Sequence, residues 1–185
     1  MQQPIRICII VSFIFLLFTI PCISVGQNLT GETVKAQFIK DWERARDYTL
    51  EYLNAMPADK YSFKAVDSIR SFAQQMLHLA TGTVYFITNA TDKKIDWPGA
   101  NIEGRPTSQG KDSVVYYVLK SYDFAIESIK SFDPAKFGEM IGQDRRRDTR
   151  LAYLMKGFEH QTHHRGQTTI YIRLLGIRPP GEKLF

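Results

Sequence analysis

Four stretches with apolar side chains at helical spacing dominate the sequence, and segments rich in Gly, Pro, Asn and Asp separate them. Helices are expected at about residues 34–56, 66–89, 113–132 and 149–175. Pro57 ends the first of them, and Gly176 followed by Pro179 ends the last. The sequence shows no alternating strand pattern of useful length and no internal repeat. The pattern therefore predicts an all-α fold, a four-helix bundle.

The connection between the second and third helices is the long one. Residues 91–110, TDKKIDWPGANIEGRPTSQG, contain several Gly, Pro, Asn and Asp residues and are expected to form a surface loop. At 185 residues the chain is expected to form one domain, residues 27–185, once its first 26 residues are set aside.

Those first 26 residues have the layout of a secretory signal peptide. Arg6 precedes an apolar run at residues 7–20, then Pro21, with small residues at Ser24 and Gly26. Cleavage is expected after Gly26, and the run is shorter than the roughly 20 residues that a membrane-spanning helix needs. We therefore expect an exported protein, periplasmic or extracellular, with no stable membrane insertion after leader removal.

Both cysteines, Cys8 and Cys22, lie in this leader. Lipoprotein anchoring at Cys22 is disfavoured, because Pro21 stands where such sites have a small residue. The mature chain would then contain no cysteine, which excludes a disulfide, a thiolate metal ligand and a cysteine nucleophile.

The net charge of +5 falls to +4 once Arg6 leaves with the leader. The densest basic run, residues 145–147, is flanked by Asp144 and Asp148, and no basic stripe interleaved with aromatic residues accompanies it. A solvated connector is therefore expected there, and no nucleic-acid partner.

Three of the four histidines lie in residues 158–167, FEHQTHHRGQ. On a helix, His160 and His164 share one face because residues four apart are offset by only about 40°, whereas His163 lies on the flank. Aromatic and aliphatic residues share the His160 face, so it is expected to point inward. Thr162, Arg165, Thr169 and Arg173 are expected to point the other way.

Two histidines at this spacing can bind one metal ion if another helix supplies a third ligand. His78 is the remaining histidine, and it lies within the second helix on a face shared with Gln74, Gln75, Gly82 and Tyr85. This face either lines a polar cleft between helices or is solvated. In the second case the protein is a helical bundle whose histidines are ordinary polar residues.

At this point the sequence resembles the DinB-like (DinB/YfiT-type) family of bacterial four-helix-bundle metalloproteins. The motifs that carry the resemblance are HQTHHRGQ at 160–167, YIRLLGIRPP at 171–180, PADKYSFKA at 57–65, RSF at 70–72 and QMLHLA at 75–80. The resemblance covers nearly the whole mature chain, from about residue 34 to residue 180.

The resemblance implies a divalent metal ion bound by His78, His160 and His164, with His163 at a position the family does not use. Zinc, nickel and iron all suit imidazole ligands. Three protein ligands leave coordination positions open, which is the catalytic rather than the structural arrangement.

The resemblance implies a metal-dependent hydrolase or a thiol-dependent S-transferase that uses metal-activated water or thiol on a small-molecule substrate. The alternative is a non-enzymatic metal-binding bundle with a structural or storage role. Export counts against thiol chemistry, because low-molecular-weight thiol cofactors are mainly cytoplasmic. Gln74, Gln75, Tyr85 and Gln167 are the candidates to orient a substrate.

No carboxylate lies on the faces of the helices that carry the expected ligands. Glu159 is turned about 100° from His160, and Asp123 on the third helix is a further candidate contributor. Leu151, Met155 and Phe158 form an apolar face opposite the histidines, which could be a homodimer contact or a cover for the 133–144 connector.

Overall fold

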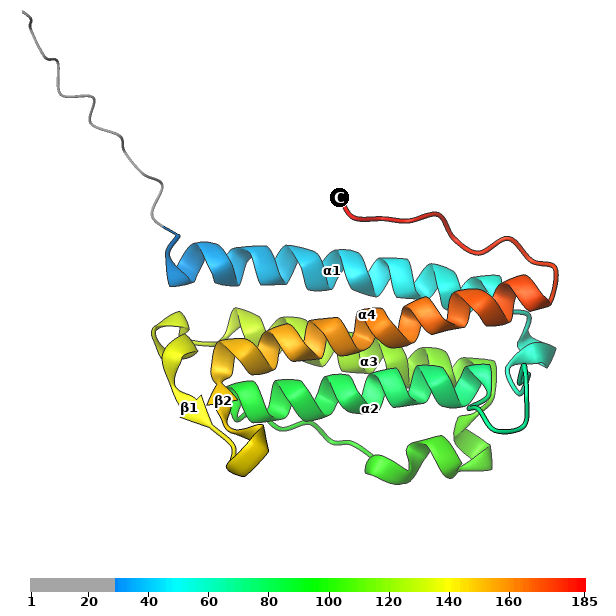
Figure 1. The fold of residues 1–185 in the computed structure, drawn as a ribbon, viewed down its shortest axis with the longest axis horizontal. Coiled ribbons are helices and arrows are strands. Elements are labelled where there is room, and N and C mark those ends of the chain that lie inside the picture. Colours follow the sequence, from blue (N-terminus) through cyan, green and yellow to red (C-terminus); the bar gives the residue numbers. More distant parts are fainter. Residues whose placement is uncertain (1–28) are drawn as a thin grey trace, which may run out of the picture.

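The computed structural model describes residues 29–185, and four long helices make up most of this part of the chain (Figure 1). They are α1 (Gly31–Ala55), α2 (Phe72–Thr91), α3 (Lys111–Lys130) and α4 (Arg150–Leu174). The only sheet among the described residues is one antiparallel pair, β1 (Met140–Ile141) with β2 (Asp148–Thr149). The predicted four-helix bundle is therefore confirmed.

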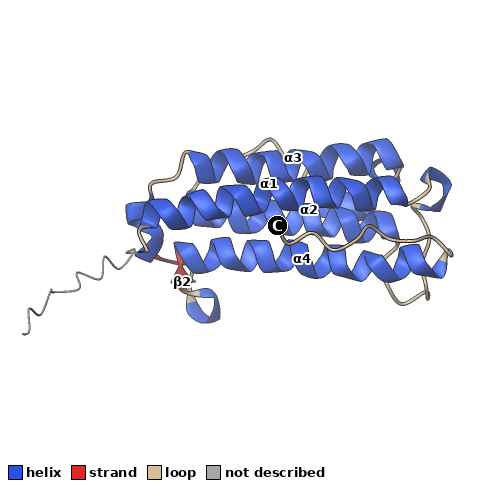
Figure 2. Cartoon of the chain, turned by 90° about the horizontal axis from the view of Figure 1, so that it is seen from above, coloured by secondary structure: helices blue, strands red, loops and turns tan. Residues whose placement is uncertain are grey.

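The helices lie side by side, and α2 and α4 share the largest interface (Figure 2). Two glycines let these helices approach each other closely. A Cβ at Gly157 would lie 3.0 Å from Cβ of Phe86, and a Cβ at Gly82 would overlap a side chain of α4. The α2–α4 interface is therefore where the chain brings its two histidine-bearing helices together.

Helix α2 begins at Phe72, later than the start near residue 66 that the periodicity predicts. Ser71 caps it, because its Oγ accepts from the backbone N–H of Gln74 at 3.2 Å while Gln74 Oε1 accepts from the Ser71 N–H at 2.9 Å. This reciprocal capping box satisfies two backbone donors at the helix start. Residues 66–70 consequently lie outside the helix, where Arg70 can turn toward the bundle.

An aromatic cluster lies in the core between α1, α3 and α4. Trp42 packs edge-on against Tyr122 and Phe158, with ring centroids 5.6 and 5.5 Å apart. Phe158 therefore packs on the core rather than standing free on the predicted apolar face. On that face Met155 is 57% exposed, and it lines a shallow groove with Phe38.

The long connection between α2 and α3 packs against the bundle instead of lying freely on its surface. It contains two short 3₁₀ segments, η2 (Ala100–Gly104) and η3 (Pro106–Ser108). Ile102 is fully buried, and η2 packs against α2. This anchoring brings the neighbouring Glu103 to the α2–α4 interface.

Beyond α4, residues 177–185 run back across the bundle beside α1, and we call them the C-terminal strap (Figures 1 and 2). Lys183 pairs with Glu51, and Arg44 donates to the Lys183 carbonyl at 2.6 Å. Among the described residues no helix is long and apolar enough to cross a membrane. The predicted leader, residues 1–26, lies outside the described residues.

Candidate metal centre

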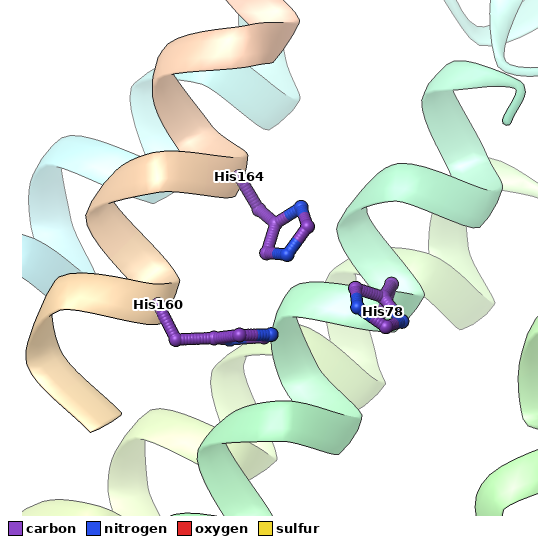
Figure 3. Close-up of side chains that lie close together, drawn as sticks. All are labelled: His78, His160 and His164. Atoms are coloured by element: carbon purple, nitrogen blue, oxygen red, sulfur yellow. The ribbon is translucent and has the colours of Figure 1, made fainter. Parts of the chain in front are cut away.

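His78 from α2 and His160 and His164 from α4 converge at the α2–α4 interface (Figure 3). Each offers a ring nitrogen within 4.8 Å of the nitrogens of the other two. The ring centroids of His160 and His164 are 4.4 Å apart, and those of His78 and His164 are 4.5 Å apart. The structure thus brings together the three histidines that the sequence singles out. Three imidazole nitrogens that converge in this way could hold one divalent ion.

Gly82 makes room for His160. A Cβ at position 82 would lie 2.0 Å from Cε1 of His160 and 2.5 Å from its Nδ1, far inside van der Waals contact. The His160 ring therefore lies directly against the backbone of α2, which only glycine permits at this point. Gly82, one turn beyond His78, positions the ligand that α4 supplies.

Glu103 fixes the orientation of His78. Its Oε1 lies 2.6 Å from His78 Nδ1, and its Oε2 accepts from Arg70 Nε at 2.9 Å. A carboxylate at this distance favours the tautomer with the proton on Nδ1, which leaves the Nε2 lone pair free. Metal-binding histidines commonly have such a carboxylate on their second nitrogen.

Gln75 contacts the ring of His164, since its side-chain Nε2 lies 2.8 Å from His164 Nδ1. His160 differs from both. Its Nδ1 is buried and has no hydrogen-bond partner among the described residues. A buried polar atom without a partner is costly, so His160 has a nitrogen that a bound ion could satisfy.

Burial keeps two of the three imidazoles neutral. Desolvation, and then the neighbouring His78, lowers the pKa of His160 to about 4. Desolvation and the charge of His160 lower the pKa of His164 to about 3. Because a metal ligand must be unprotonated, both rings are ready to bind an ion at neutral pH.

His163 lies outside this cluster. It is exposed, and its Nε2 lies 2.9 Å from the side-chain amide of Gln167. Its ring packs edge-on against that of His164, with centroids 4.9 Å apart. The helical phase that separates His163 from the inward pair is therefore confirmed.

An open cleft of about 830 Å³ adjoins the cluster. Gln74, Gln75 and Gln167, three of the four residues expected to orient a substrate, line it, together with Arg70 and Glu103. Since Gln75 contacts His164 and Glu103 contacts His78, the cleft wall and the histidines form one continuous site.

The other candidates lie elsewhere. Tyr85 is 41% exposed, and its hydroxyl accepts from Arg146 at 3.4 Å in a separate pocket. Asp123 pairs with Arg46 at 2.6 Å between α1 and α3. Glu159 is exposed on the side of α4 that faces Phe38. None of these three side chains belongs to the site.

The expectation that no carboxylate lies on the ligand-bearing helix faces is correct, but the site still has one. Glu103 comes from the connection after α2, and Arg70 comes from the segment before it. Helical periodicity carries no information about Glu103, and it wrongly placed Arg70 inside the second helix, which begins only at Phe72. The one sequence signal was Ile102, an apolar residue in a polar segment that anchors Glu103 beside the bundle.

The donor set fits a divalent metal ion. Neutral imidazoles suit zinc, nickel and iron, two of the rings have a polar partner on a second nitrogen, and the third has an unpaired buried nitrogen. No fourth protein ligand accompanies the three histidines in the described part of the chain. Such a site is of the open kind that leaves room for an exogenous ligand.

A helical bundle with three converging histidines defines the class of this protein, and family comparison gives the family itself. The model of the DinB family matches residues 27–184. The chain therefore belongs to the DinB family, as the resemblance in its motifs predicts. No curated protein matches the chain.

Solved structures share this fold at low sequence identity. A DinB-like protein from Bacillus cereus is 19% identical, with a TM-score of 0.68 over 80% of this chain and 97% of that one. A DinB-like protein from Bacillus subtilis is 18% identical, with a TM-score of 0.59 over 80% and 96%. A conserved protein from Enterococcus faecalis is 17% identical, with a TM-score of 0.60 over 77% and 98%. These likenesses show the fold.

Proposed function

We propose that this DinB-family protein binds one divalent metal ion, zinc, nickel or iron, through His78, His160 and His164. We further propose that it uses this ion in a hydrolase or transferase reaction on a small molecule. The observation that carries the proposal is the convergence of three imidazole nitrogens within 4.8 Å, one ring having a buried nitrogen without a partner.

When bound, the ion would supply Lewis acidity that lowers the pKa of a water or thiol ligand and so provides a nucleophile near neutral pH. The protein residues have other roles. Glu103 holds the proton of His78 on Nδ1, and Gln75 holds the ring of His164. Both interactions fix ring orientation before any substrate arrives.

The cleft supplies the substrate-binding part of the proposal. Gln74 and Gln167 offer amide donors and acceptors, while Ile69, Ile170 and Tyr171 offer apolar surface. Arg70 adds a positive charge, partly neutralised by Glu103 at 2.9 Å. This lining suits a small polar molecule with an apolar portion, held beside the histidines.

Metal analysis tests the first part of the proposal. The mature protein, purified without a polyhistidine tag, is expected to hold about one divalent ion per chain. The His160→Ala/His164→Ala variant is expected to hold almost none, whereas His163→Ala, a matched change on the same helix, keeps the wild-type content. Equal, negligible metal in wild type and double variant would overturn metal binding.

A screen of ester, amide and thiol-transfer substrates tests the second part. Activity that needs the metal and disappears in the His160→Ala/His164→Ala variant supports the enzyme. A protein that binds metal yet turns over none of these substrates would instead be a metal-binding bundle of structural or storage role.

We also propose that the protein is exported, on the strength of the leader-like layout of residues 1–26. Cell fractionation and N-terminal sequencing test this. A mature chain that begins near Gln27 in the exported fraction is the expected result, and an intact N-terminus in the cytoplasm contradicts it.

A further inference from the structure

Arg165 is a buried cation that the metal centre does not use. It lies on α4 next to His164 in sequence but faces α1, and only 6% of it is exposed. No carboxylate lies within salt-bridge distance of it in the described part of the chain. A buried guanidinium without an anionic partner is unusual, because desolvating a charge is costly.

One edge of this guanidinium is already occupied. Nη1 donates to Gln161 Oε1 at 2.9 Å and to Thr49 Oγ1 at 3.3 Å. The ring of Tyr48 covers one face, 4.6 Å from Cζ. Gln161 also accepts from the Tyr122 hydroxyl at 2.7 Å. The inner side of Arg165 is therefore held rigidly by neutral groups.

The other edge is unused. Nε and Nη2 make no hydrogen bond to the described residues. These two N–H groups form the side-on fork with which arginine binds carboxylate and phosphate oxygens in bidentate fashion. Arg165 thus offers a fixed, unfilled pair of donors.

A cavity of about 350 Å³ adjoins Arg165, between α1, α4 and the C-terminal strap. Arg173, two turns along α4, adds a second guanidinium to its wall. Hydroxyl groups also line it: Tyr52 and Thr169 bond to each other at 3.1 Å, and Tyr48 lies 3.3 Å from Tyr52. The strap residues Pro179 and Pro180 close one side.

We propose that this cavity is a second ligand site, in which Arg165 and Arg173 bind a small oxyanion, a carboxylate or phosphate group, beneath the C-terminal strap. The buried charge, its free fork and the hydroxyl-lined cavity all point to the same ligand chemistry. The site is separate from the metal centre and does not depend on it.

One residue of the cavity wall carries a negative charge, which is unfavourable for an anionic ligand. Glu182 on the strap lines the same cavity, is exposed, and makes no ion pair with Arg165 in the described structure. Its negative charge is expected to weaken anion binding, so removing that charge should strengthen it. Glu182→Gln therefore tests the sign of the electrostatics directly.

The experiment titrates the metal-free mature protein with inorganic phosphate and, separately, with acetate at constant ionic strength. Calorimetry gives the affinity, and the ¹H–¹⁵N signal of the Arg165 side-chain Nε reports contact in the wild-type chain. Use of metal-free protein, and repetition in the His160→Ala/His164→Ala background, keep any anion binding at the histidines out of the result.

Saturable binding that shifts the Arg165 signal is the expected result, and the tighter anion identifies the ligand class. Arg165→Lys should weaken binding at least tenfold, Arg173→Gln several-fold, and Glu182→Gln should tighten it. If Arg165→Lys fails to fold, the wild-type signal and Arg173→Gln decide. Absence of saturation, unchanged affinity in Arg173→Gln and Arg165→Lys, or binding seen only in Glu182→Gln would overturn the proposal.

Discussion

The two buried polar faces of α4 differ in how many of their hydrogen-bonding atoms have a partner within the protein. Toward α2, His160 and His164 meet His78, and one ring nitrogen is left without a partner. Toward α1, Gln161 and Arg165 join Tyr122 and Thr49 in a network of hydrogen bonds. The first face offers neutral imidazole nitrogens, whereas the second contains the guanidinium of Arg165.

This difference separates a polar group with an unpaired buried nitrogen from polar groups that are bonded to one another within the fold. His160 and His164, whose pKa values are lowered by burial, offer unprotonated nitrogens to a cation at neutral pH. A guanidinium bonded to neutral oxygens on one edge stabilises helix contacts with that edge and leaves the other for an anion. Substitutions on each face should therefore affect different measurements.

The largest effect is expected from Gly82→Ala. The new methyl group would overlap the His160 ring, which must leave its position. Metal content is expected to fall from about one ion per chain to near zero, and stability to fall by about 1–3 kcal/mol through overpacking. Metal analysis and urea unfolding measure the two effects.

Gly166→Ala is the matched control. Gly166 is also within a helix, but a Cβ there has open space around it. We expect unchanged metal content and a gain of roughly 0.5–1 kcal/mol in helix stability. Equal loss of metal in both variants would mean that Gly82 has no particular role for His160.

The next effect is expected from Glu103→Gln, which keeps the shape of the side chain but removes the charge that holds His78 Nδ1–H. Metal affinity is expected to fall by about 10–100-fold, as for other partners of metal-binding histidines. The fold should persist, because Ile102 still anchors the connection. Competition with a chromogenic chelator measures the affinity.

Asp123→Asn serves as the control for Glu103→Gln. It likewise removes one negative charge, here from the Asp123 side chain that pairs with Arg46 between α1 and α3. Unchanged metal affinity is expected there. An affinity loss of the same size in both variants would point to general electrostatics rather than to the His78–Glu103 contact.

Helical phase alone predicts the bundle and the inward histidines. The i, i+4 spacing separates His160 and His164 from His163, and this is a local property of the chain. The pairing with His78 is a tertiary contact between helices far apart in sequence. The spacing of the residues does not predict this pairing, whereas the resemblance to the DinB-like family does.

The partners of the histidines could not be predicted in this way. Glu103 reaches the site because Ile102 is buried against α2, which is a packing outcome of a long connection. Arg165 was expected on the side away from the histidines, and it is there. Arg165 itself proves to be buried against α1, whereas Thr162 and Arg173 on the same side of α4 are exposed. Helical phase predicts the direction in which a side chain points, but its burial depends on which other helix packs against that side.

On the Arg165 face, Tyr122→Phe is expected to lower the free energy of unfolding by about 1–2 kcal/mol, because it removes the hydroxyl that bonds to Gln161 and Thr49. The ring keeps its edge-on contact with Trp42. Metal content should not change. Reduced metal content in this variant would show that the two faces of α4 are coupled.

The smallest expected effect is the pH dependence of stability, which depends on the histidine face of α4 and not on the Arg165 face. The pKa values of His160 and His164 are lowered to about 4 and about 3 by burial, from about 6.5 in the unfolded chain. At pH values between the lowered pKa values and about 6.5, the unfolded chain binds more protons than the folded one. The stability of the metal-free protein is therefore fully present above about pH 6.5 and is lost as pH falls toward 4.

We expect the metal-free wild-type protein to lose stability between about pH 7 and about pH 5.5, a range above the titration of most carboxylates. His160→Gln/His164→Gln has no titrating group at these positions and should lose clearly less. Tyr122→Phe should keep the wild-type dependence, because its face of α4 carries no histidine. Parallel pH profiles for wild type and the double glutamine variant would mean that the two histidines are not the groups that couple protons to folding.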